Sequence, residues 1–258
     1  DVLQAECAVM HHVAAAATCP HLITTIDGHE IARAGEHFVR LISALPGTPL
    51  GDTAYRTPAL RTDIGRALAT LNAALSDFDH PAFHRDFHWD LANAARVVHE
   101  LLPQVTDAAL RTHIVAIAAQ HRATVVPALD GLRRSVIHAD ANDYNLLVDA
   151  RAQVVTGIID FGDMVYSHTV NDVAIAMAYV MLDADDRLAA AADVLRGYHA
   201  VHPLSDAEIS VAWTLACMRL CVSACMAARQ QAARPDDAYL GISQGPIART
   251  LPRLASIH

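Results

Sequence analysis

Residues 136–148 read Val-Ile-His138-Ala-Asp140-Ala-Asn-Asp-Tyr-Asn145-Leu-Leu-Val, and residues 155–163 read Val-Thr-Gly-Ile-Ile-Asp160-Phe-Gly-Asp163. The apolar runs 145–148 and 154–159 are typical of short strands, and residues 149–151 between them predict a turn. The hairpin formed in this way brings Asn145 close to Asp160. The sequence therefore predicts a cluster of polar side chains around one β-hairpin.

The residue types in this cluster are those that phosphoryl transfer from a nucleotide requires. A carboxylate must accept or orient the proton of the acceptor hydroxyl, and oxygen ligands must hold the Mg²⁺ that neutralises the phosphates. Asp140 is suited to the first task, and Asn145 with Asp160 to the second. The alternative is that two short strands simply carry polar caps, which the spacing of the three residues makes the weaker interpretation.

With these motifs the sequence resembles the aminoglycoside phosphotransferase and choline kinase-like small-molecule kinases, and within them the hydroxylysine kinase branch. The segments that carry the resemblance are 157–167 and 172–182, with a weaker match over residues 3–50. The resemblance implies an α+β, protein-kinase-like fold with a mostly helical C-lobe and a partial N-lobe. It also implies Mg²⁺ as cofactor and ATP or GTP as phosphoryl donor.

Transferred by position, the resemblance gives each residue of the hairpin region a role. Asp140 would be the catalytic carboxylate, and Asn145 and Asp160 would be the Mg²⁺ ligands. His138 would support the catalytic loop without reacting. Asp172 would begin the next helix and hold the backbone of the loop.

The resemblance also implies a nucleotide site. Leu147 and Ile159 would form the apolar floor under the base, and the strand from Ser43 to Leu45 would be the hinge. Glu6, in the first helix, would be the acid that pairs with the phosphate-binding lysine of the family.

Two features depart from the family pattern. Ala139 replaces the glycine of the usual His-Gly-Asp, which is tolerable if its φ is negative. The larger departure is that all 19 basic residues are arginine, so Glu6 is expected to lack its partner. Arg40 looks poorly placed to substitute. We therefore expect a piece of a longer protein, with loss of the N-lobe as the alternative. The resemblance also implies that the parent protein can carry a second enzyme module, as some bacterial members of the family do.

The sequence Pro46-Gly47-Thr48-Pro49 predicts a boundary between two domains. Residues 1–46 would form the partial N-lobe, with a helix over 3–17 and strands over 22–26 and 38–45. Residues 47–258 would form the C-lobe. Its helices are expected over 63–75, 90–102, 106–121, 171–182, 186–200 and 206–232, and a third short strand over 135–138.

Composition excludes several other classes of protein. The formal net charge of −9 argues against a nucleic-acid partner. Because the sequence contains no lysine, it can form neither a Walker P-loop nor a Schiff base with a substrate or cofactor. The glycines never occur as Gly-x-Gly, so the fingerprint of a dinucleotide-binding fold is absent as well. The odd number of cysteines, 5, favours a reducing, cytoplasmic setting. The apolar stretch 209–228 contains Arg219, so we expect a buried helix and no membrane association.

Four further motifs are expected to be structural or accidental. His84-Arg85-Asp86 copies a protein-kinase triplet but lacks the asparagine that should follow. His80, His84 and His88 are interpreted as a surface or cleft cluster rather than a metal site. The Gly-x-Ser-x-Gly match at 241–245 has no acid after it, and Cys217, Cys221 and Cys225 share one helix stripe and should pack in a core.

The acceptor is the least determined part of the site. A small hydroxylated amine or amino acid is expected, with 5-hydroxylysine first and an aminoglycoside, choline or homoserine as alternatives. A degenerate kinase fold that only binds a ligand is the non-enzymatic alternative. Residues placed by location alone near the acceptor are Tyr166, Tyr179, Asp183, Trp213 and Arg219.

Overall fold

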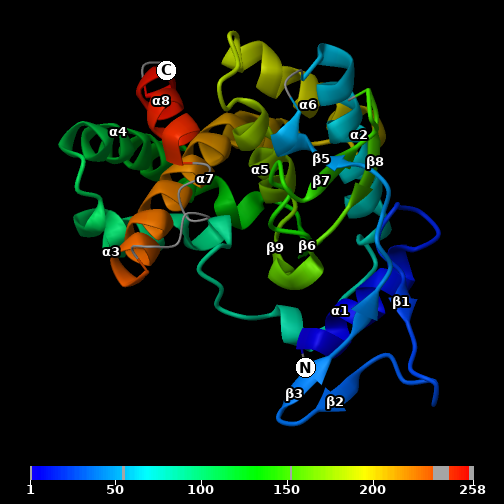
Figure 1. Cartoon of the computed structure of the whole chain (residues 1–258). Helices are drawn as coiled ribbons and strands as arrows, with labels where there is room; N and C mark the ends of the chain where they lie inside the picture. Colours follow the sequence, from blue (N-terminus) through cyan, green and yellow to red (C-terminus); the bar gives the residue numbers. More distant parts are fainter. Residues whose placement is uncertain (1, 54–55, 152, 235–243, 256–258) are drawn as a thin grey trace.

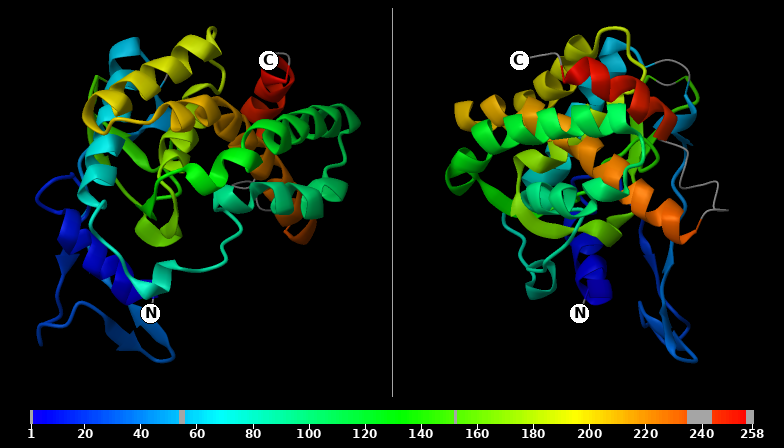
Figure 2. Two further views of the ribbon diagram at one scale, coloured as in Figure 1. Left: turned by 180° about the vertical axis from the view of Figure 1, so that it is seen from behind. Right: turned by 90° about the vertical axis from the view of Figure 1, so that its left-hand side faces the viewer.

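The N-terminal region is a helix followed by short antiparallel strands. A computed structural model of the chain describes residues 2–53, 56–151, 153–234 and 244–255. The region contains α1 (Val2–Val13), β1 (Leu22–Ile23), β2 (Ala32–Ala34), β3 (His37–Val39) and β4 (Leu41–Ile42). Strand β1 pairs with β4 and β2 with β3, and the β2–β3 hairpin projects from the rest of the molecule in every view (Figures 1 and 2). The sequence did not predict β2.

Helices make up most of the remaining chain (Figure 1). They are α2 (Pro58–Ala74), α3 (Ala94–Leu101), α4 (Ala108–Thr124), α5 (Val170–Val180), α6 (Arg187–Val201), α7 (Asp206–Ala233) and α8 (Gln244–Leu254). Every residue of α5 is buried, because α7, α6 and α2 pack around it. Helices α2 and α6 approach closely at Gly65 and Gly197, where an added Cβ would collide with the backbone of the other helix.

Two small sheets carry the polar segment 136–163 between the helices. Strands β5 (Thr48–Pro49), β7 (Leu146–Val148) and β8 (Val155–Ile158) form one sheet. Strands β6 (Arg134–Ile137) and β9 (Val165–His168) form the other, and β9 was not predicted. Residues 48 and 49 of the proposed boundary form β5, which pairs with β7. The N-terminal region is therefore followed directly by a strand of the sheet that contains the β7–β8 hairpin. Single turns of 3-10 helix lie between these elements, among them η6 (Phe161–Asp163).

The helix α7 contains the stretch that resembles a membrane span. Among the described residues it is the helix whose length and composition would suffice to cross a membrane, and 83% of its most apolar window is buried in the protein. It contacts α3, α4, α5 and α8. A capping box between Ser205 and Glu208 fixes its start. The helix is thus a core helix of the fold, as the sequence predicts.

Candidate active site

The loop after β6 is held by one buried carboxylate. Asp172, in the first turn of α5, accepts hydrogen bonds from the backbone N–H of His138 at 2.9 Å and of Ala139 at 2.7 Å. The side-chain amide of Asn72 donates to the same carboxylate at 2.7 Å. Asp172 therefore fixes the direction of the loop as it leaves the strand.

Ala139 adopts a left-handed backbone conformation, with φ at 64°. The condition under which alanine would be tolerated here, a negative φ, is therefore not met. The reason is that two successive N–H groups must point at one carboxylate, that of Asp172. The residue bears a strain that glycine would not have.

His138 connects the loop to the neighbouring hairpin. Its Nε2 atom lies 3.0 Å from the carbonyl oxygen of Ile159, and its ring packs edge-on against Phe161, with ring centroids 5.1 Å apart. Its Nδ1 accepts from the backbone N–H of Asp140 at 3.3 Å. The imidazole is buried, so its place is that of a support beneath the loop.

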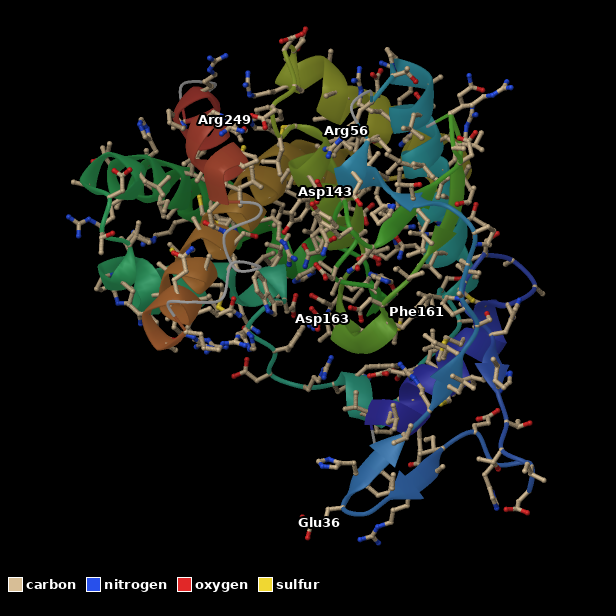
Figure 3. All side chains as sticks on the ribbon, viewed as in Figure 1. Glu36, Arg56, Asp143, Phe161, Asp163 and Arg249 are labelled. Atoms are coloured by element: carbon tan, nitrogen blue, oxygen red, sulfur yellow. The ribbon has the colours of Figure 1, made fainter. Side chains whose placement is uncertain are left out.

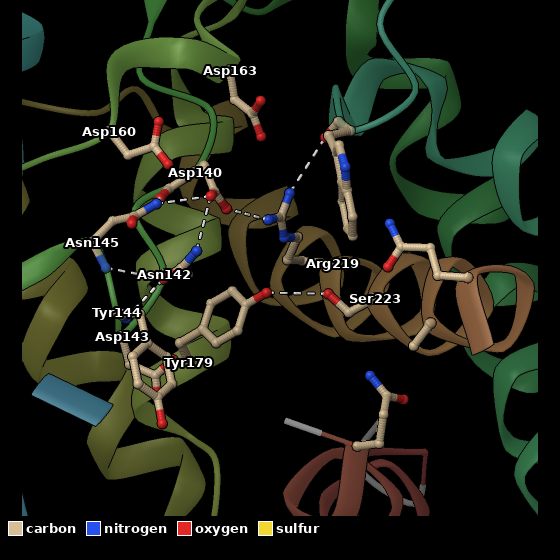
Figure 4. A pocket seen from close by; sticks show the side chains of 14 residues that line it. Asp140, Asn142, Asp143, Tyr144, Asn145, Asp160, Asp163, Tyr179, Arg219 and Ser223 are labelled. Atoms are coloured by element: carbon tan, nitrogen blue, oxygen red, sulfur yellow. Dashed lines mark hydrogen bonds and ion pairs between the residues drawn. The ribbon is translucent and has the colours of Figure 1, made fainter. Parts of the chain in front are cut away.

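Asp140 has donors on both of its carboxylate oxygens (Figure 4). Oδ1 accepts from Nη2 of Arg219 at 2.5 Å. Oδ2 accepts from the side-chain amides of Asn142 at 2.9 Å and Asn145 at 2.8 Å. Burial raises the pKa of Asp140, and the charge of Arg219 opposes that rise.

The hairpin brings the two predicted metal ligands together. The backbone N–H of Ile159 donates to the carbonyl oxygen of Asn145 at 3.0 Å, which places Asp160 beside Asn145. Both side chains line one cavity of about 240 Å³, together with Asp140 and Asp163. Asp163 was not predicted as a site residue, although it follows Asp160 by only three positions. Burial, with the nearby Asp140 and Asp160 carboxylates, raises the pKa of Asp163 to about 6.

The donor set of this cavity fits Mg²⁺. The side chains of Asn145 and Asp160 offer oxygen atoms, which hard divalent cations prefer, and Mg²⁺ commonly takes few protein ligands beside phosphates and water. No group of three or more His, Cys, Asp or Glu side chains suited to a metal occurs within the described part of the chain.

A second cavity of about 570 Å³ lies between α1, β4 and the catalytic hairpin. It brings together the four residues proposed for the nucleotide base, namely Ser43, Leu45, Leu147 and Ile159. Asp160 and Phe161 also line it, so the two cavities meet at the end of β8. In Figure 3, Phe161 lies where the N-terminal region meets the helical body.

Glu6 has a partner, contrary to the expectation from the sequence. Nη2 of Arg40 lies 2.6 Å from a carboxylate oxygen of Glu6, and both side chains are largely buried. Burial raises the pKa of Glu6, and Arg40 opposes the rise. Arg40 lies between β3 and β4, and its ion pair with Glu6 connects this part of the chain to α1. It also lines the larger cavity, with its Nη1 buried and without a hydrogen-bond partner.

The acceptor candidates separate in the structure. Tyr179 and Arg219 line the cavity around Asp140. Asp183 lies in a neighbouring cavity and pairs with Arg249 at 2.8 Å, and Tyr166 stacks on His84. Trp213, half-buried in α7, lines none of the cavities described here. Residues of the Asp140 cavity that sequence reasoning missed are Trp89, Asn142, Asp143, Tyr144, Ser223, Ala227, Gln230 and Gln244.

The remaining motifs have structural roles where they are described. Arg85 donates to the carbonyl oxygens of Gly162 and Met164, at 3.0 and 2.9 Å. Cys217, Cys221 and Cys225 are buried free thiols in α7. Of the Gly-x-Ser-x-Gly match, positions 241–243 lie outside the described residues.

Comparison with known proteins identifies relatives of this chain. The sequence model of the phosphotransferase enzyme family matches residues 1–240. Hydroxylysine kinase from Mus musculus is 32% identical over 203 residues, which are 74% of this chain and 54% of that protein. The Xenopus laevis hydroxylysine kinase is 33% identical, over 73% of this chain and 54% of its own length. The chain thus spans about half the length of these curated relatives.

Solved structures show the same fold at low sequence identity. A microcompartment-associated aminopropanol kinase matches with a TM-score of 0.71 and 19% identity, over 98% of this chain and 82% of its own. An amicoumacin kinase in complex with AMP-PNP and Ca²⁺ matches with a TM-score of 0.68 and 14% identity, over 98% and 77%. The predicted α+β, protein-kinase-like fold with a mostly helical C-lobe is confirmed.

Proposed function

The chain belongs to the phosphotransferase enzyme family, and we propose that its protein transfers the terminal phosphoryl group of ATP or GTP to a hydroxyl of a small amine or amino acid. The acceptor we propose first is 5-hydroxylysine. The observation that carries the proposal is that Asp140, Asn145 and Asp160 line one cavity, which adjoins a second, larger cavity at the end of β8.

In this proposal each side chain has one task. Asp140 accepts the proton of the acceptor hydroxyl, and Asn145 with Asp160 holds Mg²⁺. The bound ion supplies positive charge to the phosphates as the bond to the leaving nucleotide breaks. Leu147 and Ile159 contact the base of the nucleotide, beside the hinge strand at residues 43–45.

The size and charge of the acceptor cavity favour a small substrate. At about 240 Å³ it is smaller than the roughly 300–1,000 Å³ typical of pockets for drug-sized ligands. Its carboxylates suit an ammonium group, as in a hydroxylated amine. The relatives named hydroxylysine kinase support this class over aminoglycosides.

A binding module without catalysis is the second candidate. It is favoured by the complete absence of lysine from the 258 residues, because the kinase family uses a lysine on the phosphates. The intact cluster around Asp140 supports the enzyme instead.

One experiment separates the two candidates. The full-length protein is incubated with Mg²⁺ and either ATP or GTP, with 5-hydroxylysine, aminopropanol, choline, homoserine or an aminoglycoside as acceptor, and nucleotide consumption is measured. We expect turnover with the hydroxylated amines and a strongly reduced rate in the Asp140→Asn variant. Nucleotide binding without turnover on any acceptor would support the binding module.

A further inference from the structure

Arg219 is a buried cation whose charge faces the active site. It lies within α7, its side chain is 2% exposed, and its Nη2 donates to Oδ1 of Asp140 across 79 residues of sequence. Its Nη1 lies 3.4 Å from the backbone carbonyl oxygen of Trp89. A desolvated charge of this kind is costly unless it is paired, so the contact with Asp140 is a fixed part of the fold.

Two aromatic rings hold the guanidinium group in place. Its central carbon lies 4.8 Å from the ring centroid of Trp89 and 5.7 Å from that of Tyr179. The hydroxyl of Tyr179 is in turn hydrogen-bonded to Ser223 at 3.2 Å. Figure 4 shows Arg219 directed at Asp140 with Tyr179 beside it. The arginine therefore has little freedom to leave the carboxylate.

Because Asn142 and Asn145 hold the other oxygen, the Asp140 carboxylate is fixed at both ends. We propose that Arg219 is the positioning residue of Asp140, which sets the carboxylate plane so that a free lone pair meets the acceptor hydroxyl. This inference rests on the proposed function. Its physical basis is that phosphoryl transfer depends mainly on positioning, and a misplacement of about 1 Å can cost roughly 10²-fold in rate.

The test is a double-mutant cycle in the full-length protein. Arg219→Met should lower kcat by about 10²-fold and leave the KM of the nucleotide unchanged, and Arg219→Lys should lose less because it keeps the charge. In the Asp140→Asn background, Arg219→Met should have no further effect on kcat, since a residue that acts only through Asp140 has nothing left to position.

A second measurement guards against a variant that folds poorly. In Arg219→Ala, added guanidinium should restore part of kcat, because it can occupy the space between the two rings. Arg61→Met is the matched control: it removes another largely buried ion pair, with Asp193, between α2 and α6. It should lower the melting temperature while kcat is kept.

Three results would overturn the proposal. The first is a kcat loss for Arg219→Met that adds fully to that of Asp140→Asn. The second is weaker acceptor binding, measured by calorimetry, when Arg219→Met is added to Asp140→Asn, since Arg219 would then bind the acceptor directly. The third is an unchanged kcat in Arg219→Met beside an inactive Asp140→Asn. Full activity in Asp140→Asn would overturn the proposed function itself, and this role with it.

Discussion

The N-terminal region and the catalytic loops use left-handed backbone differently. Among the described residues from 2 to 47, those with a positive φ are all glycines. Two of them are Gly28 and Gly35, where an added Cβ would have no neighbouring atom within 4 Å. In the catalytic loops Ala139 and Asp160 both have φ at 64°. Glycine adopts this conformation without strain, whereas other residues must be held in it. Of the three described non-glycine residues with positive φ, two therefore lie beside the proposed chemistry, and the third, Asp183, follows α5.

The two regions also differ in how they bury apolar side chains. Phe38 is 66% exposed and Leu41 is 60% exposed in the N-terminal strands, whereas α5 is buried along its whole length. Figure 3 places Glu36 at the far tip of the β2–β3 hairpin, away from the body. Helix α1 nevertheless shares the core of the helical body, since Val9 and Val13 belong to the same buried apolar cluster. The N-terminal strands contribute chiefly a wall of the larger cavity, with Arg40 among its lining residues.

The largest expected effect belongs to the catalytic body. Asp140→Asn in the full-length protein should lower kcat by roughly 10²–10⁴-fold, the range for loss of a general base. It should leave Mg²⁺-dependent nucleotide binding nearly unchanged. Asp160→Asn should instead weaken that binding, because it removes a proposed metal ligand. Steady-state kinetics and calorimetry check both, and equal losses of nucleotide affinity would contradict these roles.

The next largest effect concerns the absence of lysine from the N-terminal region. The 258-residue chain alone should be folded but should turn over roughly 10²–10³-fold more slowly than the full-length protein, by analogy with the loss of one preorganised donor. It contains neither a lysine nor a Gly-x-Gly loop to hold the phosphates. Circular dichroism and phosphotransfer assays on the two proteins test this. Comparable rates would show that residues of this chain suffice.

Local sequence patterns predicted the catalytic hairpin well. The neighbourhood of Asn145 and Asp160 follows from two strands and a short turn, and the pairing of β7 with β8 produces it. Helix periodicity likewise predicted both ends of α4 to α7 to within a few residues. It also predicted the end of α2, but placed the start of that helix at 63, whereas α2 begins at Pro58. Hairpins and helices depend on residues that are close in sequence, so a local sequence pattern is enough to predict them.

The parts that sequence could not predict depend on long-range packing. Arg40, just before β4, pairs with Glu6 of α1, and Arg219 meets Asp140 across 79 residues. Trp89 carries no motif that marks it as part of the cavity. The φ of Ala139 is set by Asp172, which lies on another element. These features need the three-dimensional arrangement of the helices.

A smaller effect should test the contact between the two regions. Glu6→Gln removes the charge that faces Arg40 and leaves that arginine buried without its ion pair. We expect nucleotide affinity to fall about tenfold, which is about 1.4 kcal/mol, because Arg40 lines the cavity proposed for the nucleotide. Calorimetry with a non-hydrolysable nucleotide measures it. Arg33→Met, on exposed β2, is the control and should change nothing, and an unaltered affinity in Glu6→Gln would mean that the pair has no part in binding.

The catalytic body should also show a pH dependence that originates at Asp163. Its pKa in the folded state is about 6, above the ordinary value of 3.8, because of burial and the neighbouring carboxylates. Between these values the folded state binds the proton more readily than the unfolded state, so this residue adds stability as pH falls from above about 6 towards 4. Asp163→Asn should remove that gain. Melting temperatures at pH 7.5 and 4.5 measure it, and an identical pH response in both proteins would exclude the assignment.

The smallest effect returns to the left-handed positions. Ala139→Gly should stabilise the protein by roughly 0.5–1 kcal/mol, since a left-handed conformation costs a non-glycine residue about 1–2 kcal/mol and the added freedom of glycine in the unfolded chain offsets about half of that. Gly35→Ala, in the open β2–β3 turn with φ at 64°, should destabilise by a similar amount. Urea denaturation of both variants measures the two changes. Because the amide of residue 139 still donates to Asp172, Ala139→Gly should keep kcat, and a loss of activity would mean that the methyl group itself shapes the loop.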